Sequence, residues 1–473
     1  MFTLMTAMVI IPMIGLAIDG SILYWTKAKL SAAVDAGALA AGRDLGADST
    51  TTARSYIYAN LPVGWLGTSY SPAPTVKVDL DTPTLGTRRV TVAASVIVPL
   101  YFMRILGQQN ATVSASGISS RRDTDIVLII DRSYSMQQAG ACSTMINSAK
   151  SFVNNFADGR DTLSLVSYST TANVDFPYNT SFKPTLNNKL DTAVCNGYTN
   201  TASALKLAYD QIKAMPNAST KLNVIVLFTD GIPDAVQLNF TGNGATNATN
   251  VIKVLSDNRY LWNDTGNDGS STSVSACSKS VALRGILVDK PGDGSSTGQT
   301  GGLYNPASVP ISTNVLLPGL ISGGTCGFPG NELKVRNDIA YLPPADEFGD
   351  TFDGFRTVPS TGTNPDKFPT GNYSGKVRTD TPQSITHAAE NAADAEAQTI
   401  RNDATYKTVI YTIGLGGTSF QPIDDELLRR VANDPLSTSY NSSQSTGEYI
   451  PCTAAGLASA FQQVASQILH LAK

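Results

Sequence analysis

Residues 125–135, with the sequence DIVLIIDRSYS, place oxygen-bearing side chains at alternate positions after an apolar run. The run DIVLII has the length of a strand and is rich in β-branched residues, which favours a buried strand of a parallel sheet over a short helix. Asp131, Ser133 and Ser135 follow it, and a tight loop would bring one carboxylate and two hydroxyls to one point. These are hard oxygen ligands, suited to Mg²⁺, Mn²⁺ or Ca²⁺ and poorly suited to Zn²⁺. Alone, the spacing is a weak signal, because Ser and Asp are common in loops.

Two later stretches bring further oxygen ligands to the same place. Residues 221–229, KLNVIVLFT, predict a second buried strand, and Asp230 follows it directly. Between the two strands, a glycine-containing turn in residues 196–207 delivers Thr199 before a helical pattern. In open doubly wound sheets, ligands bind beyond the carboxyl ends of the strands, where the strand order reverses. We therefore expect Asp131, Asp230 and Thr199 to border one crevice.

This set of side chains resembles the metal-ion-dependent adhesion site of von Willebrand factor type A domains. The D-x-S-x-S motif of that site, its threonine and its T-D-G aspartate are matched here by Asp131, Ser133, Ser135, Thr199 and Asp230. The resemblance implies that the serines and the threonine bind a divalent cation directly, while the aspartates often act through water. It implies Mg²⁺ as the first choice of ion, with Mn²⁺ or Ca²⁺ as alternatives, and a ligand carboxylate that completes the coordination shell. The threonine position stays open between Thr199 and Thr201, since the glycine pair that usually precedes it reads Gly197-Tyr198.

The N-terminal segment predicts a membrane helix. Residues 1–17 are almost entirely apolar, and the pattern continues to Trp25. About 20 helical residues match the hydrocarbon thickness of a bilayer, and Tyr24 and Trp25 lie where an interfacial belt would be. A cleavable signal peptide is the alternative, but no charged n-region precedes the apolar run. We expect a single pass through the inner membrane by residues 1–25.

Two features of the sequence give opposite predictions for the orientation of that helix in the membrane. Lys27 and Lys29 follow the apolar run, and the positive-inside rule would place the body of the protein in the cytoplasm. We nevertheless expect the body outside the cytoplasm, because the chain begins abruptly at its apolar core, as though a short basic leader preceded it.

Two further stretches resemble one family of pilus proteins. Residues 27–45, KAKLSAAVDAGALAAGRDL, continue the helix with many small residues, which suits close packing against other helices. A hydrophobic helix that runs into such a segment is similar to the N-terminus of the TadE/TadG-type proteins of tight-adherence (Flp-type) pilus assembly. Residues 89–107 and 111–120 resemble the strand pair that follows the helix in that family. The resemblance implies a pilin-like, single-pass protein of the bacterial inner membrane, with its body in the periplasm or at the cell surface.

Composition and periodicity divide the chain into segments. The predicted fold class is α/β: a doubly wound, mainly parallel sheet of the von Willebrand A type with a long insertion, preceded by the membrane helix and a small β-rich, pilin-like module. The segments are 1–45 (membrane-spanning and extended helix), 46–122 (β-rich module), 123–234 (first part of the von Willebrand A-like domain), 235–381 (irregular or β insertion) and 382–473 (second part of that domain). The insertion emerges at the metal face and is either a ligand-contacting lid or a spacer without a binding role. Its acid clusters at 264–269 and 346–353 miss the spacing of a calcium loop.

The five cysteines include no C-x-x-C pair, so a zinc ribbon is not expected. Cys142 and Cys195 fall in the two loops that flank the predicted crevice, and their pairing would fit an oxidising compartment. A second pairing, of Cys277 with Cys326 within the insertion, would leave Cys452 free. Connectivity cannot be read from sequence, so this pairing is a hypothesis.

The sequence gives little support to an enzymatic function. The chain has no H-E-x-x-H, no G-x-S-x-G and no P-loop, and its two histidines, His387 and His470, lie far from any candidate nucleophile. The net charge of −4 gives no reason to expect nucleic acid as a partner.

Three hypotheses follow for the function. The first is a membrane-anchored, non-enzymatic pilus-assembly or minor-pilin-like protein, which binds a protein partner through a metal-bridged carboxylate and contacts other pilus subunits. The second is a surface or secreted adhesin that grips host or matrix carboxylates through the same site. The third is an intracellular, metal-dependent assembly factor that resembles chelatase or AAA-partner subunits.

Overall fold

The computed structural model describes residues 2–43, 48–80, 87–243, 251–254, 260–263, 280–288, 303–304, 345–352, 354–356, 382–416 and 423–472. They form two compact units. The first unit holds residues 1–124 together with 220–222 and 469–473, and the second holds residues 125–219 and 223–468.

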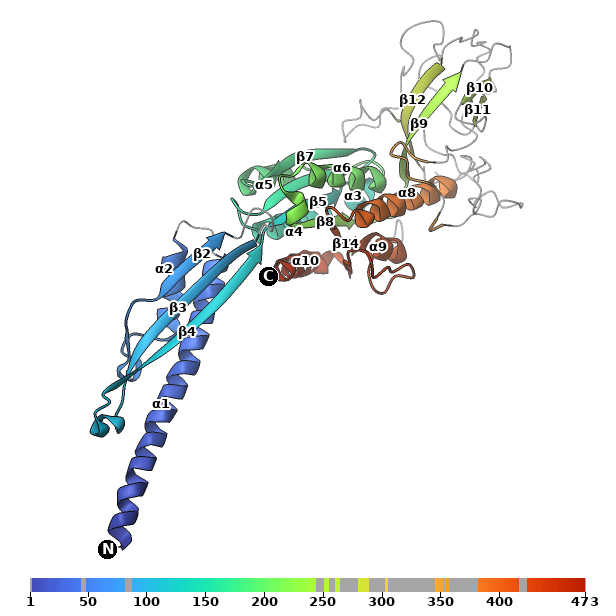
Figure 1. The fold of residues 1–473 in the computed structure, drawn as a ribbon. Helices are drawn as coiled ribbons and strands as arrows, with labels where there is room; N and C mark the ends of the chain where they lie inside the picture. The colour runs from blue at the N-terminus through green and yellow to red at the C-terminus, as the bar shows by residue number, and fades with distance from the viewer. Residues whose placement is uncertain are drawn as a thin grey trace. The chain divides into compact units, whose positions relative to one another are not determined.

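The first unit is a long helix packed on a small antiparallel sheet (Figure 1). Its helices are α1 (Phe2–Arg43), α2 (Ser49–Asn60) and the short η1 (Trp65–Gly67) and η2 (Met103–Leu106). Its strands are β1 (Ser69–Tyr70), β2 (Thr75–Leu80), β3 (Thr87–Pro99) and β4 (Asn110–Arg122). β3 pairs with β4 along its whole length, and β2 and β1 pair with the other edge of β3.

The alternation of side chains along β3 explains how this unit is held together. Val90, Val92 and Val96 are fully buried, because successive residues of a strand point to opposite faces and these three share one face. They pack in one core with Leu30 and Val34 of α1. The unit therefore follows the predicted order of a helix and then a strand pair.

Helix α2 departs from the expectation of a β-rich module over residues 46–122. Its sequence, STTTARSYIYAN, is rich in β-branched and aromatic residues, which favour strands. Two features outweigh that preference. The Asp48 carboxylate caps the helix by accepting from the Thr51 N–H, and Ala53 and Ile57, one turn apart, are fully buried in the core beside α1.

The membrane helix predicted for residues 1–25 is not confirmed. Within the ranges that the structure describes, none of the helices combines the length and the apolar character needed to cross a membrane.

The second unit contains a six-stranded mixed sheet in the order β15-β14-β8-β5-β6-β7. The strands are β5 (Thr124–Asp131), β6 (Thr162–Tyr168), β7 (Ala172–Asn179), β8 (Leu222–Thr229), β14 (Val409–Leu415) and β15 (Tyr449–Cys452). β5 is parallel to β6, and β14 is parallel to both β8 and β15, whereas β7 is antiparallel to β6. Every residue of β5, β6, β8 and β14 is buried, as expected for strands covered on both faces.

Helices cover both faces of this sheet (Figure 1). They are α3 (Tyr134–Gln138), α4 (Cys142–Asn154), α5 (Lys183–Asp191), α6 (Thr201–Ala214), α8 (Pro382–Asn402), α9 (Asp425–Ala432) and α10 (Leu457–Leu471). On one face, Phe461 of α10 contacts the rings of Phe152 in α4 and Phe228 in β8. On the other, α6, α8 and α9 share one core with the sheet. The prediction of a doubly wound α/β fold is confirmed.

The described part of the insertion forms a separate antiparallel sheet in the order β11-β10-β9-β12-β13. Its strands are β9 (Ala235–Asn243), β10 (Val251–Val254), β11 (Tyr260–Asn263), β12 (Ser280–Val288) and β13 (Leu303–Tyr304). β9 begins five residues after Asp230 and pairs with β12 over nine residues. The sequence predicted an insertion that is either irregular or made of β-strands, and the described part contains β-strands. The acid cluster at 264–269 lies outside the described residues.

Candidate metal centre

The two aspartates of the candidate site lie at the ends of neighbouring strands. Asp131 is the last residue of β5, and Asp230 follows the last residue of β8, the strand next to β5 in the sheet. Asp131 is fully buried and Asp230 is 1% exposed. The two buried strands therefore place both carboxylates at one edge of the sheet, where they are shielded from water.

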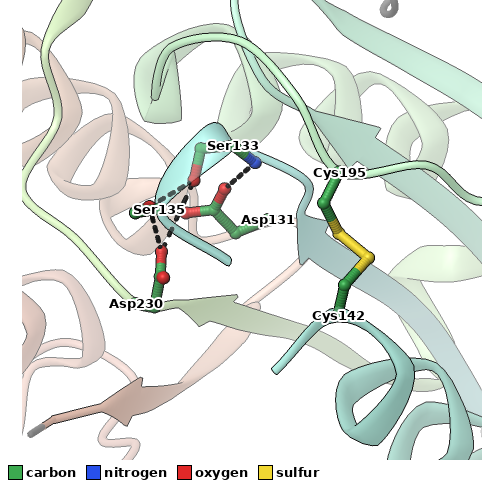
Figure 2. The surroundings of a disulfide bond; sticks show 6 residues. All are labelled: Asp131, Ser133, Ser135, Cys142, Cys195 and Asp230. Carbon is green, nitrogen blue, oxygen red and sulfur yellow. Dashed lines mark hydrogen bonds between the residues drawn. A yellow bond between two sulfur atoms is a disulfide. The ribbon is translucent and has the colours of Figure 1, made fainter. Parts of the chain in front are cut away.

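The serines of the loop after β5 join these carboxylates (Figure 2). The Ser133 N–H donates to Asp131 Oδ1 at 2.8 Å, which turns the loop back over the strand end. The Ser133 and Ser135 hydroxyls lie 2.8 Å apart. Ser135 Oγ donates to Asp230 Oδ1 at 2.7 Å, and Ser133 Oγ lies 3.4 Å from the same oxygen. The structure thus brings four of the five predicted residues together.

Thr199 is held beside this cluster by its backbone. Its carbonyl accepts from the N–H groups of Asp234 and Ala235 at 3.0 and 3.3 Å, and its own N–H donates to the Asp234 carboxylate. Thr199 is 2% exposed. The preceding Gly197 carbonyl accepts from Tyr134 N–H at 2.8 Å, so the threonine loop is tied directly to the serine loop.

Thr201 points to a different partner. The Thr201 hydroxyl acts on the phenol of Tyr168, at the end of β6, and opposes the rise that burial causes in the pKa of that phenol. Tyr168 in turn donates to Asp131, so both threonines stay near the site and Thr199 stays the predicted ligand.

Two further residues donate hydrogen bonds to Asp131. The sequence analysis placed both in strands and gave neither a role in the site. Thr229 Oγ1 donates to Asp131 Oδ2 at 2.7 Å, and the Tyr168 hydroxyl donates to the same oxygen at 3.3 Å. Both are buried. The position of Thr229 before Asp230 could have signalled its role, whereas nothing in the local sequence distinguishes Tyr168 from a core residue.

The ionised forms of Asp131 and Asp230 are disfavoured by their surroundings. Burial raises the pKa of Asp131. Burial, and then the nearby charge of Asp131, raise the pKa of Asp230 to about 7. Asp230 Oδ2 is buried and has no hydrogen-bond partner among the residues that the structure describes. A buried, unpaired carboxylate oxygen facing a second carboxylate is the environment that a cation relieves.

The donor types therefore fit a hard divalent ion. Two carboxylates and two hydroxyls meet within hydrogen-bond reach, with a third hydroxyl on the neighbouring loop. Oxygen ligands of this kind suit Mg²⁺ or Ca²⁺. Metal binding itself remains a prediction.

A disulfide links the loops around the site, as Figure 2 shows. Cys142, the first residue of α4, is bonded to Cys195, with 6.2 Å between their Cα atoms. Cys195 directly precedes Asn196, whose N–H donates to the Arg132 carbonyl at 2.7 Å. The predicted pairing is confirmed. Cys452 is free, and Cys277 and Cys326 lie outside the described residues.

Solved structures similar to this chain include bacterial pilus proteins, at low identity. The von Willebrand factor domain of the type V pili tip protein Mfa5 from Porphyromonas gingivalis is 18% identical, with 75% of this chain and 97% of that one covered and a TM-score of 0.38. The PilB minor pilin from Streptococcus sanguinis is 12% identical, with 86% and 79% covered and a TM-score of 0.36. Similarity this low carries no argument about function. No curated protein matches the chain.

Family models match two parts of the chain. The model described as putative Flp pilus-assembly TadE/G-like matches residues 1–44. The model of the von Willebrand factor type A domain matches residues 126–232, which contain all five candidate residues. The chain therefore combines a TadE/G-like N-terminal segment with a von Willebrand factor type A domain.

Proposed function

We propose that this protein is a non-enzymatic pilus-assembly or minor-pilin-like component, whose von Willebrand factor type A domain binds a protein partner through a divalent metal ion. One observation carries the proposal: the Asp131–Ser133–Ser135–Asp230 cluster, in which Asp230 keeps a buried Oδ2 without a hydrogen-bond partner in the described part of the chain.

Each side chain has a role in the proposed site. The hydroxyls of Ser133, Ser135 and Thr199 bind the ion, and Mg²⁺ is the ion we expect first. Asp131 and Asp230 neutralise its charge, directly or through water. A carboxylate of the partner protein takes a remaining coordination position, so that the ion bridges two proteins. Thr229 and Tyr168 hold Asp131 in place.

The pilus context and the location come from the N-terminal segment. The match of residues 1–44 to a pilus-assembly family supports a protein that contacts other pilus subunits. The apolar sequence of residues 1–25 supports attachment to the inner membrane, and the Cys142–Cys195 disulfide supports a body exposed to an oxidising compartment. The adhesin alternative shares the metal site, but the TadE/G-like match favours the pilus assignment.

Removal of Asp131 tests the metal-bridged interaction. The full chain and an Asp131→Ala variant are titrated with Mg²⁺ and Mn²⁺ by calorimetry. Both are then used to capture partners from a cell-envelope extract, with and without EDTA. We expect Asp131→Ala to weaken metal binding at least about 100-fold and to abolish the EDTA-sensitive capture, because a charged ligand held by three hydrogen bonds is lost. Ser133→Ala should have a milder effect, since water can replace a hydroxyl.

Asp191→Ala is the matched control, because Asp191 is an exposed aspartate of α5 that pairs with Lys150. It should bind metal and partner as the unchanged chain does. Partner capture that persists in EDTA would contradict the metal bridge.

A further inference from the structure

The loop between β3 and β4 exposes large apolar side chains. Within residues 101–106, here called the hairpin tip, Tyr101 is 57% exposed, Ile105 82% and Leu106 72%. Single exposed apolar residues are ordinary, but several in one short loop mark a contact surface. A turn that served only to connect two strands would be expected to be polar instead.

The hairpin tip is fastened to α1. The Asp19 carboxylate accepts from the N–H groups of Tyr101, Phe102 and Met103, at 3.0, 2.9 and 2.7 Å. Asp19 is 1% exposed. A Cβ added at Gly15 would lie 2.6 Å from Phe102, so the ring rests directly on the helix there. These contacts fix the position of the hairpin tip along α1, beside Gly15 and Asp19.

At that height α1 is apolar on several sides. Met13 is 67% exposed, Ile14 54%, Leu16 56% and Ile18 40%. At about 100° per residue, Met13, Ile14 and Leu16 point in different directions around the helix, and Ile18 lies one turn from Ile14 on the same side. No charged residue precedes Asp19 in the sequence, and the Asp19 charge is satisfied by the backbone of the tip. A helix that is apolar all round fits lipid better than the groove of one protein partner.

The residues that follow have the composition of a membrane interface. Tyr24 and Trp25 are 74% and 69% exposed, and Lys27 and Lys29 come next in the sequence. Arg104 adds a cation to the tip. Aromatic rings and basic side chains gather at the headgroup level of bilayers. In Figure 1, α1 continues toward the N-terminus beyond the end of the β3–β4 hairpin, so the tip lies part of the way along the helix.

We propose that the hairpin tip is a second membrane contact, in which Ile105 and Leu106 enter the surface of a lipid bilayer beside α1. Asp19 positions the tip for this contact by holding three of its N–H groups. The contact would set the depth of the N-terminal unit in the membrane. It rests on the proposed membrane location but is independent of the metal site.

Depth-dependent quenching of an added tryptophan tests the contact, measured against the background of Trp65 and Trp262 that both variants share. The full chain, with Trp25→Phe to remove the neighbouring fluorophore, receives either Ile105→Trp or Ile118→Trp. Ile118 is the matched control: it is 66% exposed and lies on β4, roughly 25 Å along the strand from the tip. Each variant is reconstituted with vesicles of phosphatidylcholine and phosphatidylglycerol, with and without bromine on the upper acyl chain. The fluorescence that each added tryptophan contributes is compared, and flotation measures membrane attachment.

We expect the Ile105→Trp signal to be blue-shifted and quenched about twofold more strongly by brominated lipid than the Ile118→Trp signal. Equal quenching in protein that floats would overturn the tip contact and leave the membrane attachment standing. Failure to float would overturn both. A blue shift without quenching by brominated lipid would mean that protein, rather than lipid, covers the tip.

Discussion

Two carboxylates that face each other in a buried notch are the central feature at the scale of residues. The Asp131 carboxylate accepts hydrogen bonds from the Ser133 N–H and from the hydroxyls of Thr229 and Tyr168. Asp230 accepts from Ser135 and keeps one oxygen without a partner. Without a cation, this arrangement costs free energy by desolvation and by repulsion between like charges. A divalent cation in the proposed site would relieve both costs.

Replacing Asp230 by asparagine should therefore have opposite effects with and without metal. In EDTA at neutral pH, Asp230→Asn should raise the free energy of unfolding by roughly 1 kcal/mol, because a buried charge and its repulsion with Asp131 are removed. In excess Mg²⁺ the order should reverse, since only the unchanged chain gains stability from the ion. Thermal unfolding in both buffers measures the effect. Asp79→Asn, at a partly exposed aspartate of β2 that pairs with Lys77, should shift both curves equally and by little. The same order of stabilities in both buffers would contradict the metal site.

At the scale of elements, three loops are tied into one rim around the notch. Hydrogen bonds join the serine loop to the threonine loop through Tyr134 and Gly197. The threonine loop is joined in turn to Asp234, in the segment that leads into β9. The Cys142–Cys195 bond fastens the start of α4 to the same loop. A rim that is held before the ion arrives lowers the ordering cost of binding it.

Loss of this disulfide should weaken both the fold and the site. The bond closes a segment of 53 residues, so the paired substitutions Cys142→Ser and Cys195→Ser should cost about 3–4 kcal/mol of unfolding free energy. Mg²⁺ affinity should fall a few-fold because the threonine loop is less ordered. Denaturant unfolding and calorimetry measure the two effects. Cys452→Ser, at the free cysteine, serves as the control, and unchanged Mg²⁺ affinity in the double variant would show that the rim does not depend on the bond.

At the scale of the whole molecule, an N-terminal unit with a TadE/G-like segment is joined to a von Willebrand factor type A domain that receives a long insertion. The insertion returns to the domain through residues 345–352, which contact α8. There, Asp346 Oδ1 accepts from the N–H groups of Phe348 and Asp350 at 2.8 and 3.0 Å. Asp350 faces Glu396 of α8, with Lys206 of α6 as the nearby cation. The attachment of the insertion thus includes buried carboxyl groups.

These groups predict that the stability of the second unit depends on pH. Burial, and then Glu396, raise the pKa of Asp350 to about 8, and burial raises the pKa of Asp346 to about 7. An acid whose pKa rises on folding stabilises the fold while it is protonated. Its contribution is complete below about pH 4 and is lost as the pH rises through about 8.

Asp350→Asn, which mimics the protonated acid, isolates this dependence. Between pH 5 and 9, the unchanged chain should lose several degrees of melting temperature relative to the variant, roughly 1–2 kcal/mol. Thermal unfolding of both chains across this range, with Asp79→Asn at the partly exposed Asp79 as control, makes the comparison. A difference between the two chains that stays constant with pH would contradict the assignment.

The sequence by itself determined the sheet and most of the metal centre, because both depend on local patterns. Buried strands are continuous apolar runs, and parallel neighbours bring their carboxyl ends to one edge, so Asp131 and Asp230 had to meet once β5 and β8 were recognised. The serine spacing needed only a tight loop after Asp131.

Only the tertiary structure decided which groups support that centre and which surfaces stay uncovered. Tyr168 contacts Asp131 from another strand, and Asp350 meets Glu396 across 46 positions of sequence. Residues 49–60 became a helix because Ile57 is buried beside α1, against the local preference for strand. The exposure of Ile105 likewise depends on where Asp19 holds its loop. Such contacts join residues far apart in the chain, and a local pattern does not contain them.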